Sequence, residues 1–231
     1  MKRNKTSELE ILNNIFPQIS DDDLNKIINK SHIKKYQKGE LILNKDNIAE
    51  SLYILIDGII HIGYLSPSGR FHAFNYFSEK SVINLLPCLK TQALDYDYYA
   101  FNQVKILHIP REIFLKELNK NSQLSSGVLQ LMADRMQLLL NEIKFLHIAN
   151  LHQKVCKTLL DLSGKYGASH QAGTEIKLRI SQHDLADLLS SSRQTINKEI
   201  KGLVGKNVLD WQYENIVIKN HDYLKSQVFG I

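Results

Sequence analysis

The stretch that most constrains the fold of this chain is residues 181–203, which have the pattern of two short helices joined by a tight turn. Ser181 is a favoured N-cap residue, and Asp184 stands three positions later, where a carboxylate completes a capping box. The first helix then carries apolar residues at the spacing i, i+3, i+4, namely Leu185, Leu188 and Leu189. Three serines at 190–192 end this helix and provide the N-cap of the next one. The segment therefore predicts a helix-turn-helix.

The second helix of this motif has one apolar and one polar face. We expect its apolar positions to be buried, namely Ile196, Ile200 and Leu203. Its polar positions are Arg193, Gln194, Asn197, Lys198 and Lys201. Arg and Gln can pair bidentately with guanine and adenine edges in the major groove of DNA, and Lys can reach guanine or phosphate. Residues 191–206 contain four basic side chains and one acidic side chain, so the local charge also favours a DNA partner.

The overall composition narrows the class of protein further. The chain carries 29 basic and 24 acidic residues, a net charge of +5, which is compatible with a nucleic-acid partner. No Cys-x-x-Cys motif occurs, so we expect Cys88 and Cys156 to be small core residues and no metal to be bound. The basic residues 1–5 precede no apolar run, and no segment is long enough to span a membrane. The sequence predicts a cytoplasmic protein without a membrane partner.

Motifs of enzymes are missing from the sequence. It contains no glycine-rich phosphate loop, no Gly-x-Ser-x-Gly and no His-Glu-x-x-His. The isolated carboxylates Glu79, Asp95 and Asp97 do not suffice to propose a reaction. We therefore expect no enzyme activity.

Residues 31–109 form a block in which short apolar runs alternate with turn signals. Tyr and Ile, which favour strands, are frequent in it. The runs 53–56 and 59–62 flank Asp57-Gly58, which is a signal for a β-hairpin. Several short strands at this spacing predict a closed β-roll, preceded by two short helices within residues 7–30.

Residues 122–150 have a continuous helical pattern with two apolar seams. The first seam contains Leu124, Val128, Leu131, Arg135, Leu138, Glu142 and Phe145. The second contains Leu129, Met132, Met136, Leu139, Ile143 and Leu146. Two seams need two partners, which we interpret as the β-roll and a second copy of the chain in a coiled-coil homodimer. Because methionine adapts to irregular surfaces, we assign the second seam to the β-roll. The intersubunit contact is then expected at Val128, Leu131, Arg135, Leu138, Glu142 and Phe145. A helix buried within one large domain remains the alternative.

The remaining chain predicts a winged-helix domain around the helix-turn-helix. A helix extends to residue 162, glycines at 164, 167 and 173 indicate a loop, and the alternation at 176–180 predicts a strand. Apolar runs at 208–211 and 216–218 flank residues 213–215 and predict a hairpin, the wing. The expected fold class is α+β in three parts. These are a β-roll with N-terminal helices (1–118), a dimerisation helix (119–150) and a winged helix-turn-helix that binds DNA (151–231).

This order of elements resembles the Crp/Fnr family of bacterial transcription regulators. The resemblance covers nearly the whole chain and lies in residues 38–42 and 51–60 of the β-roll, 158–162 after the long helix, and 192–196 in the helix-turn-helix. It implies a jelly roll of the cyclic-nucleotide-binding type, and a homodimer that binds an inverted-repeat, palindromic operator in double-stranded DNA. If the protein is an activator, RNA polymerase is a further expected partner.

The resemblance also implies which side chains contact DNA. The family reads bases with adjacent Arg and Glu residues and an Arg four positions after the Glu. This chain has Arg193, Gln194 and Lys198 at these positions. Because Gln pairs best with adenine, the preference at that base pair should move away from the family's G·C. Phosphate contacts are expected at Ser181, Gln182, Ser192, Thr195 and Lys201.

The expected effector site departs from the cyclic-nucleotide pattern of the family. That pattern has a Gly-Glu pair and then an Arg, whose fork holds phosphate, followed by Ser or Thr. This chain has Ser78-Glu79 and Gln92-Ala93 instead, and three leucines at 138–140 where the nucleobase would be hydrogen-bonded. We therefore expect no control by cyclic AMP and no cofactor, and we expect the isolated histidines to be core or surface residues rather than haem ligands. A pocket for an unknown small-molecule effector could involve Glu79, Gln92, Tyr96, Tyr98 and Leu139.

Two functions remain open from the sequence. The first is a homodimeric, sequence-specific transcription regulator that binds DNA and is not controlled by cyclic AMP. The second is a ligand-binding signalling module whose C-terminal domain contacts a protein rather than DNA. Arg193 and Lys198 on the polar face of the second helix favour the first function.

Overall fold

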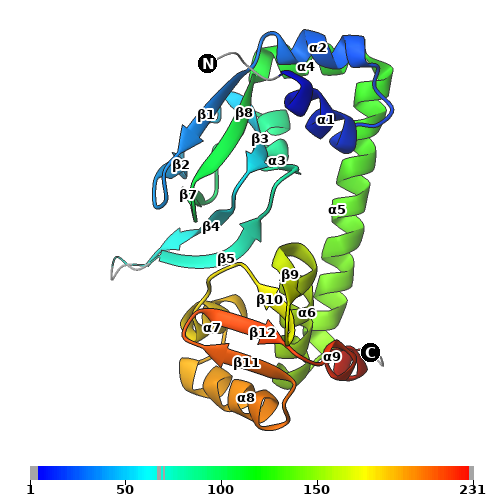
Figure 1. The fold of residues 1–231 in the computed structure, drawn as a ribbon. Coiled ribbons are helices and arrows are strands. Elements are labelled where there is room, and N and C mark those ends of the chain that lie inside the picture. Colours follow the sequence, from blue (N-terminus) through cyan, green and yellow to red (C-terminus); the bar gives the residue numbers. More distant parts are fainter. Residues whose placement is uncertain (1–4, 67–68, 70, 229–231) are drawn as a thin grey trace. The chain divides into compact units, whose positions relative to one another are not determined.

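The computed structural model describes residues 5–66, 69 and 71–228, and it consists of two compact units, residues 1–136 and 137–231 (Figure 1). Residues 1–4 of the basic N-terminus lie outside the described residues, as do residues 67, 68 and 70. The long helix α5 (Ser122–Ile148) crosses the boundary between the units.

The first unit contains two four-stranded antiparallel sheets that form the predicted β-roll. One sheet has the strand order β1-β8-β3-β6 and the other β2-β7-β4-β5. The strands are β1 (His32–Tyr36), β2 (Leu41–Leu43), β3 (Ser51–Asp57), β4 (Ile60–Leu65), β5 (Phe71–Phe77), β6 (Ser81–Val82), β7 (Asp97–Ala100) and β8 (Val104–Pro110). The helices besides α5 are α1 (Lys5–Ile15), α2 (Asp21–Ile28), α3 (Leu85–Lys90) and α4 (Arg111–Lys120).

Two apolar clusters form the core of the first unit. One joins side chains from both sheets, including the fully buried Leu55, Ile60 and Ile106. The other packs the helices against β3 and β8; its members include Leu12, Leu24, Phe114 and Leu124. Burial of such side chains is the main favourable contribution to folding, at about 1.5–3 kcal/mol each. Cys88 belongs to the second cluster, so it is the small core residue that the sequence predicted.

The hairpin predicted around Asp57-Gly58 is wrong. Strand β3 pairs with β8 and β6, whereas β4 pairs with β5 and β7, so the two strands that flank this turn belong to different sheets. Gly58 has a φ of +92°, and a Cβ there would lie 2.4 Å from the Gln103 carbonyl oxygen. The turn is therefore real, but it carries the chain from one sheet to the other, because both edges of β3 and of β4 are occupied by other strands.

The assignment of the second seam of α5 to the β-roll is wrong, because the first seam makes the contacts with the first unit. Val128 is buried in the core of the first unit and Leu131 packs against it, while Arg135 Nη2 donates to the Val82 carbonyl oxygen at 2.5 Å. Farther along the helix, Glu142 accepts a hydrogen bond from Lys157 at 2.8 Å, and the Lys157 ammonium lies 5.4 Å from the centroid of the Phe145 ring. Of the six residues predicted to contact a second subunit, these five contact their own chain, and only Leu138 is exposed.

The methionine-containing seam is the exposed one. Its exposed fractions are 67% for Leu129, 38% for Met132, 64% for Met136, 59% for Leu139, 43% for Ile143 and 46% for Leu146. Periodicity shows that a helix has two seams but not which surface each seam meets. Here Arg135 of the first seam bonds to a backbone carbonyl oxygen, and Glu142 bonds to a lysine ammonium group of the same chain. These two bonds turn the first seam of α5 toward its own chain.

The second unit is a winged helix-turn-helix. It contains α6 (Leu151–Tyr166), α7 (Gln182–Leu188), α8 (Arg193–Gly205) and α9 (His221–Val228). Its antiparallel sheet has the order β11-β12-β10-β9, formed by β9 (Gly167–His170), β10 (Gly173–Ile176), β11 (Leu209–Gln212) and β12 (Asn215–Ile218). The predicted wing hairpin is confirmed, since Leu209 faces Ile218 and Gln212 faces Asn215 in the register.

The strand predicted at 176–180 is wrong except for its first residue. Strand β10 ends at Ile176 and pairs with β9 and β12, in the region interpreted from its glycines as a loop. Ile176, Leu178 and Ile180 are all fully buried, which explains the alternation in the sequence. The segment is packed into the core, but it forms no strand beyond Ile176, and the Ile180 N–H donates to the Leu178 carbonyl oxygen at 3.1 Å.

Candidate nucleic-acid interface

Helix α7 begins with the capping box that the sequence predicts. The Ser181 hydroxyl accepts from the backbone N–H groups of His183 and Asp184, and Asp184 Oδ2 accepts from the Ser181 backbone N–H at 2.7 Å. The Ser181 hydroxyl also donates to the same carboxylate oxygen at 2.7 Å. These bonds satisfy N–H groups that a helix start otherwise leaves unpaired. They fix the residue at which α7 begins.

The turn and the start of α8 are equally well defined. Ser190 adopts a left-handed conformation with φ +48°, and the Ser191 N–H donates to the Ala186 carbonyl oxygen at 2.9 Å. The Ser192 hydroxyl caps α8 by accepting from the Thr195 N–H at 3.1 Å. The inner face of α8 is buried as predicted, at Ile196, Ile200 and Leu203.

The outer face of α8 presents the basic and amide side chains to solvent. Arg193, Gln194, Lys198 and Lys201 are exposed. Within the described part of the chain, none of these four side chains forms a hydrogen bond or ion pair. Their donors are therefore available to an external partner, whereas the acidic Glu199 points toward α6 and is paired there.

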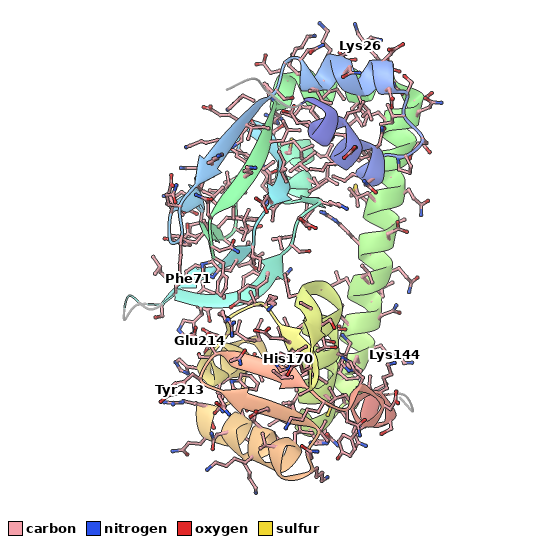
Figure 2. The ribbon with its side chains drawn as sticks, viewed as in Figure 1. Lys26, Phe71, Lys144, His170, Tyr213 and Glu214 are labelled. Atoms are coloured by element: carbon pink, nitrogen blue, oxygen red, sulfur yellow. The ribbon has the colours of Figure 1, made fainter. Side chains whose placement is uncertain are left out.

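The wing turn between β11 and β12 is held by side-chain contacts. The Trp211 indole N–H donates to the Tyr213 carbonyl oxygen at 2.7 Å, and Arg179 donates to Asn215 Oδ1 at 2.7 Å. Tyr213 has φ +55° and its side chain is 97% exposed. Figure 2 shows Tyr213 and its neighbour Glu214 at this turn. An aromatic side chain that is this exposed on a well-supported turn is available for contact with a partner.

The start of α7, helix α8 and the wing turn form a groove of about 600 Å³. It is lined by Ser181, Gln182 and His183 at the start of α7, Arg193 and Asn197 on α8, and Tyr213 and Glu214 on the wing. The sequence predicts Ser181, Gln182 and Arg193 as site residues and places Asn197 on the same polar face without a role, but it does not indicate His183, Tyr213 or Glu214. A role for Asn197 could have been found, since it follows Arg193 by one helical turn. The positions of Tyr213 and Glu214 depend on how the wing packs, which no local pattern reveals.

The predicted phosphate-contacting residues differ in whether their side chains still have a donor or a charge available for a phosphate. The hydroxyls of Ser192 and Thr195 lie 2.7 Å apart and bond to each other, and the Ser181 hydroxyl is used in the capping box. Gln182 accepts from Asn197 Nδ2 at 2.7 Å, which leaves its amide N–H groups available. Lys201 is the one predicted phosphate contact with a formal charge.

A polar chain links α8 to α6 on the side away from its exposed face. His152 Nδ1 lies 2.8 Å from Glu199 Oε2, and His152 Nε2 lies 3.7 Å from Cys156 Sγ. Burial raises the pKa of the Cys156 thiol to about 11, so the sulfur is a neutral core group, as expected from the sequence. Lys206, at the end of α8, donates to the Tyr223 hydroxyl of α9 at 2.8 Å. These bonds hold the inner side of α8 in place.

The residues predicted to line an effector pocket differ in how exposed they are. Tyr98 is buried in the core between the sheets, and desolvation raises its pKa to about 12. Tyr96 is 40% exposed and its ring packs edge-on against Phe74, with 4.6 Å between centroids. Glu79 and Gln92 are exposed, and Leu139 belongs to the exposed seam of α5. The groove of the second unit contains none of them.

Comparisons with known proteins agree with this architecture. The model of the cyclic nucleotide-binding domain matches residues 33–121, and that of the Crp-like helix-turn-helix domain matches residues 153–227. The chain is 24% identical over 197 residues to the global nitrogen regulator of Synechococcus elongatus, which covers 84% of this chain and 89% of that protein. It is 24% identical over 213 residues to the anaerobic regulatory protein of Bacillus subtilis, with 91% and 89% covered.

The fold is also shared with solved structures. The structure of FixK2 from Bradyrhizobium japonicum superposes with a TM-score of 0.72 at 17% identity, covering 87% of this chain and 98% of that chain. A β-roll of the cyclic nucleotide-binding type, followed by a long helix and a winged helix-turn-helix, defines a class of DNA-binding transcription regulators. Within this class, the chain belongs to the Crp/Fnr family. Of its described helices, none is both long and apolar enough to cross a membrane.

One histidine of the β-roll is a core residue. His108 is 6% exposed, and its Nε2 lies 3.2 Å from the Tyr36 hydroxyl oxygen. The rings of Tyr53 and His32 lie 4.5 and 4.8 Å from it, measured between centroids. Burial, together with repulsion from His32 and Lys34, lowers the pKa of His108 to about 4. His108 is therefore neutral in the folded protein at neutral pH.

The stability of the first unit should fall as the pH is lowered from about 6.5 to about 4. In the unfolded chain the His108 imidazole binds a proton near pH 6.5, whereas in the folded chain it does so only near pH 4, so acid favours the unfolded state in this window. The full loss is about 3 kcal/mol. Urea unfolding followed by circular dichroism at several pH values measures it. In His108→Gln the free energy of unfolding should depend less steeply on pH, by the uptake of one proton. An unaltered slope would contradict the assignment of this pH dependence to His108.

Proposed function

We propose that this regulator binds an inverted-repeat operator as a homodimer, with no enzyme activity of its own. The observation that carries the proposal is the outer face of α8. It presents Arg193, Gln194 and Lys198 without intrachain side-chain partners among the described residues, beside a groove formed with α7 and the wing. A recognition helix reads base edges through its N-terminal residues, where these side chains stand. Half-sites about one helical turn apart would place the two α8 helices roughly 34 Å from each other.

The side chains divide into base-reading and phosphate-contacting groups. Arg193 selects guanine and Gln194 favours adenine, while Lys198 reaches a guanine or a phosphate. Lys201 contributes charge without sequence information. Ser181, Gln182, Ser192 and Thr195 set the register. Gln182 does so through its amide N–H groups, whereas Ser181, Ser192 and Thr195, whose hydroxyl groups are already bonded, hold the two helix starts in position at the phosphates.

Arg193→Ala should weaken operator binding by about 1–3 kcal/mol and relax selectivity at one base pair, because a bidentate contact to guanine is lost. Lys201→Ala should instead weaken binding to all sequences alike and reduce the salt slope by about 1, because one phosphate contact is lost. Titrations of operator and scrambled duplexes at several salt concentrations measure both effects. If the wild-type protein binds neither duplex in a salt-dependent way, its C-terminal domain contacts a protein instead and the proposal fails.

The exposed seam of α5 supports the homodimer. Leu129, Met132, Met136, Leu139, Ile143 and Leu146 recur at alternating intervals of three and four, as in a coiled coil. Each is at least 38% exposed, and monomeric proteins rarely leave such a contiguous apolar surface in water. A second copy of the same helix covers this seam by two-fold symmetry. This proposal replaces the interface expected from the sequence.

The double variant Met132→Glu and Leu139→Glu should be monomeric and should bind the operator at least about 10-fold more weakly, because two half-sites no longer bind together. Light scattering and operator titration measure this. The matched control is Gln137→Glu with Asn141→Glu, which adds the same charge about 200° around the helix from Leu139. The control should remain a dimer. A dimeric Met132→Glu, Leu139→Glu protein would exclude this seam.

The β-roll is proposed to respond to a small molecule other than cyclic AMP, or to none. The positions that hold the cyclic phosphate in the family pattern are Gln92, which is exposed, and Ala93, which forms a β-bridge with Ile48. A neutral amide cannot replace the charge of a guanidinium fork. Effector candidates from the sequence remain Glu79, Gln92, Tyr96, Tyr98 and Leu139.

Isothermal calorimetry should detect no binding of cyclic AMP at micromolar concentrations, because the phosphate has no arginine at Gln92 or Ala93. Micromolar affinity would contradict this prediction. Arg135→Ala would then show whether the guanidinium bonded to Val82 supplies the missing contact.

The remaining assignments follow from this role. We place the protein in the cytoplasm, without a membrane partner, and expect contact with RNA polymerase if it activates transcription. The proposed domain organisation is a β-roll at 1–118, a dimerisation helix at 119–150 and a DNA-binding domain at 151–231.

A further inference from the structure

Asn197 and Gln182 form a hydrogen-bonded pair across the helix-turn-helix. Asn197 lies one turn after Arg193 on α8, and both side chains line the groove, whereas Gln194 and Lys198 do not. Asn197 Nδ2 donates to Gln182 Oε1 of α7 at 2.7 Å, and both residues are half-buried. The bond holds the Asn197 amide in one orientation before any partner arrives.

The orientation leaves Asn197 able to bind a base. An amide side chain has two N–H donors and one carbonyl oxygen. Gln182 takes one donor, so the second N–H and Oδ1 are available. An N–H with an adjacent carbonyl oxygen matches N7 and N6 of adenine, which is the usual bidentate partner of Asn in the major groove. A preorganised amide loses less conformational freedom on binding than a mobile one.

We propose that Asn197 is a further base-reading residue, selective for adenine next to the base read by Arg193, and that Gln182 is its positioning residue. The inference rests on the proposed DNA-binding function. Gln182 then acts at two places, because its oxygen orients Asn197 while its amide N–H groups remain free for the DNA backbone. The selectivity of α8 therefore depends on a residue of α7 that contacts no base.

Selection of duplex DNA from a randomised pool, followed by titration of the preferred site and its single-base variants, tests this assignment. Asn197→Ala should reduce the preference for adenine at one base pair by roughly 5- to 100-fold, as expected for one bidentate contact. Asn197→Asp keeps the shape of the side chain, but a carboxylate only accepts hydrogen bonds. Because cytosine offers an N4 donor, the preference should move from adenine to cytosine. Unchanged preference at every base pair in either variant would overturn the role of Asn197.

The positioning role of Gln182 needs a second pair of variants. Gln182→Ala should lower the adenine preference about threefold or more. Gln182→Glu keeps an oxygen for Asn197 Nδ2, so it should retain that preference while binding all sequences more weakly, because a carboxylate repels phosphate. Lys201→Ala is the control for uniform weakening without a change in preference. Loss of preference in Gln182→Glu, or uniform weakening with preference intact in Gln182→Ala, would overturn the positioning role.

Folding and function are monitored separately. Trp211, the single tryptophan of the chain, lies in the same unit, so its fluorescence reports whether each variant is folded. Failure of the proposed function has a different signature, since the wild-type protein would then select no duplex at all. A wild-type protein that selects an operator, with variants that keep its preference, would overturn this inference alone.

Discussion

A helix that buries one face against its own unit presents the rest of its surface to solvent or to a partner, and this constraint applies to both α5 and α8. Leu124, Val128 and Arg135 fix the first part of α5 against the β-roll, and the apolar seam with its two methionines is left in solvent. Ile196, Ile200 and Leu203 fix α8 in the winged helix, and its basic and amide side chains point outward. The surfaces proposed for a second subunit and for DNA are consequences of these two buried faces.

Polar groups on the inner sides of these helices add specificity to the packing. Arg135 donates to a strand carbonyl, and Glu199 is joined to His152 and through it to Cys156. A half-buried charge or amide without such a partner would be costly, so each bond favours one orientation of its helix. Desolvation lowers the pKa of Arg135 without removing its charge. The same logic applies to the Asn197–Gln182 bond, where the orientation of an amide bears on the reading of a base.

The wrong expectations share a physical cause. Asp57-Gly58 predicts a hairpin because a turn signal is local, but strand pairing depends on which strand edges are occupied by β8 and β5. Methionine content assigns the second seam of α5 to the β-roll, but both seams are apolar and methionine is a weak guide to the surface that a seam meets. Residues 177–180 alternate because they are buried, and burial does not require a strand.

Residue patterns alone predict the order of elements, the capping box at Ser181, the turn of three serines and the identity of the exposed residues on α8. These are local matters of helix periodicity and capping, which depend on neighbours within a few positions. Only the tertiary structure decided which seam of α5 is free, that β3 and β4 enter different sheets, and that Asn197, His183 and Tyr213 line one groove with Arg193. These features depend on packing between segments far apart in sequence, and no short-range pattern contains that information.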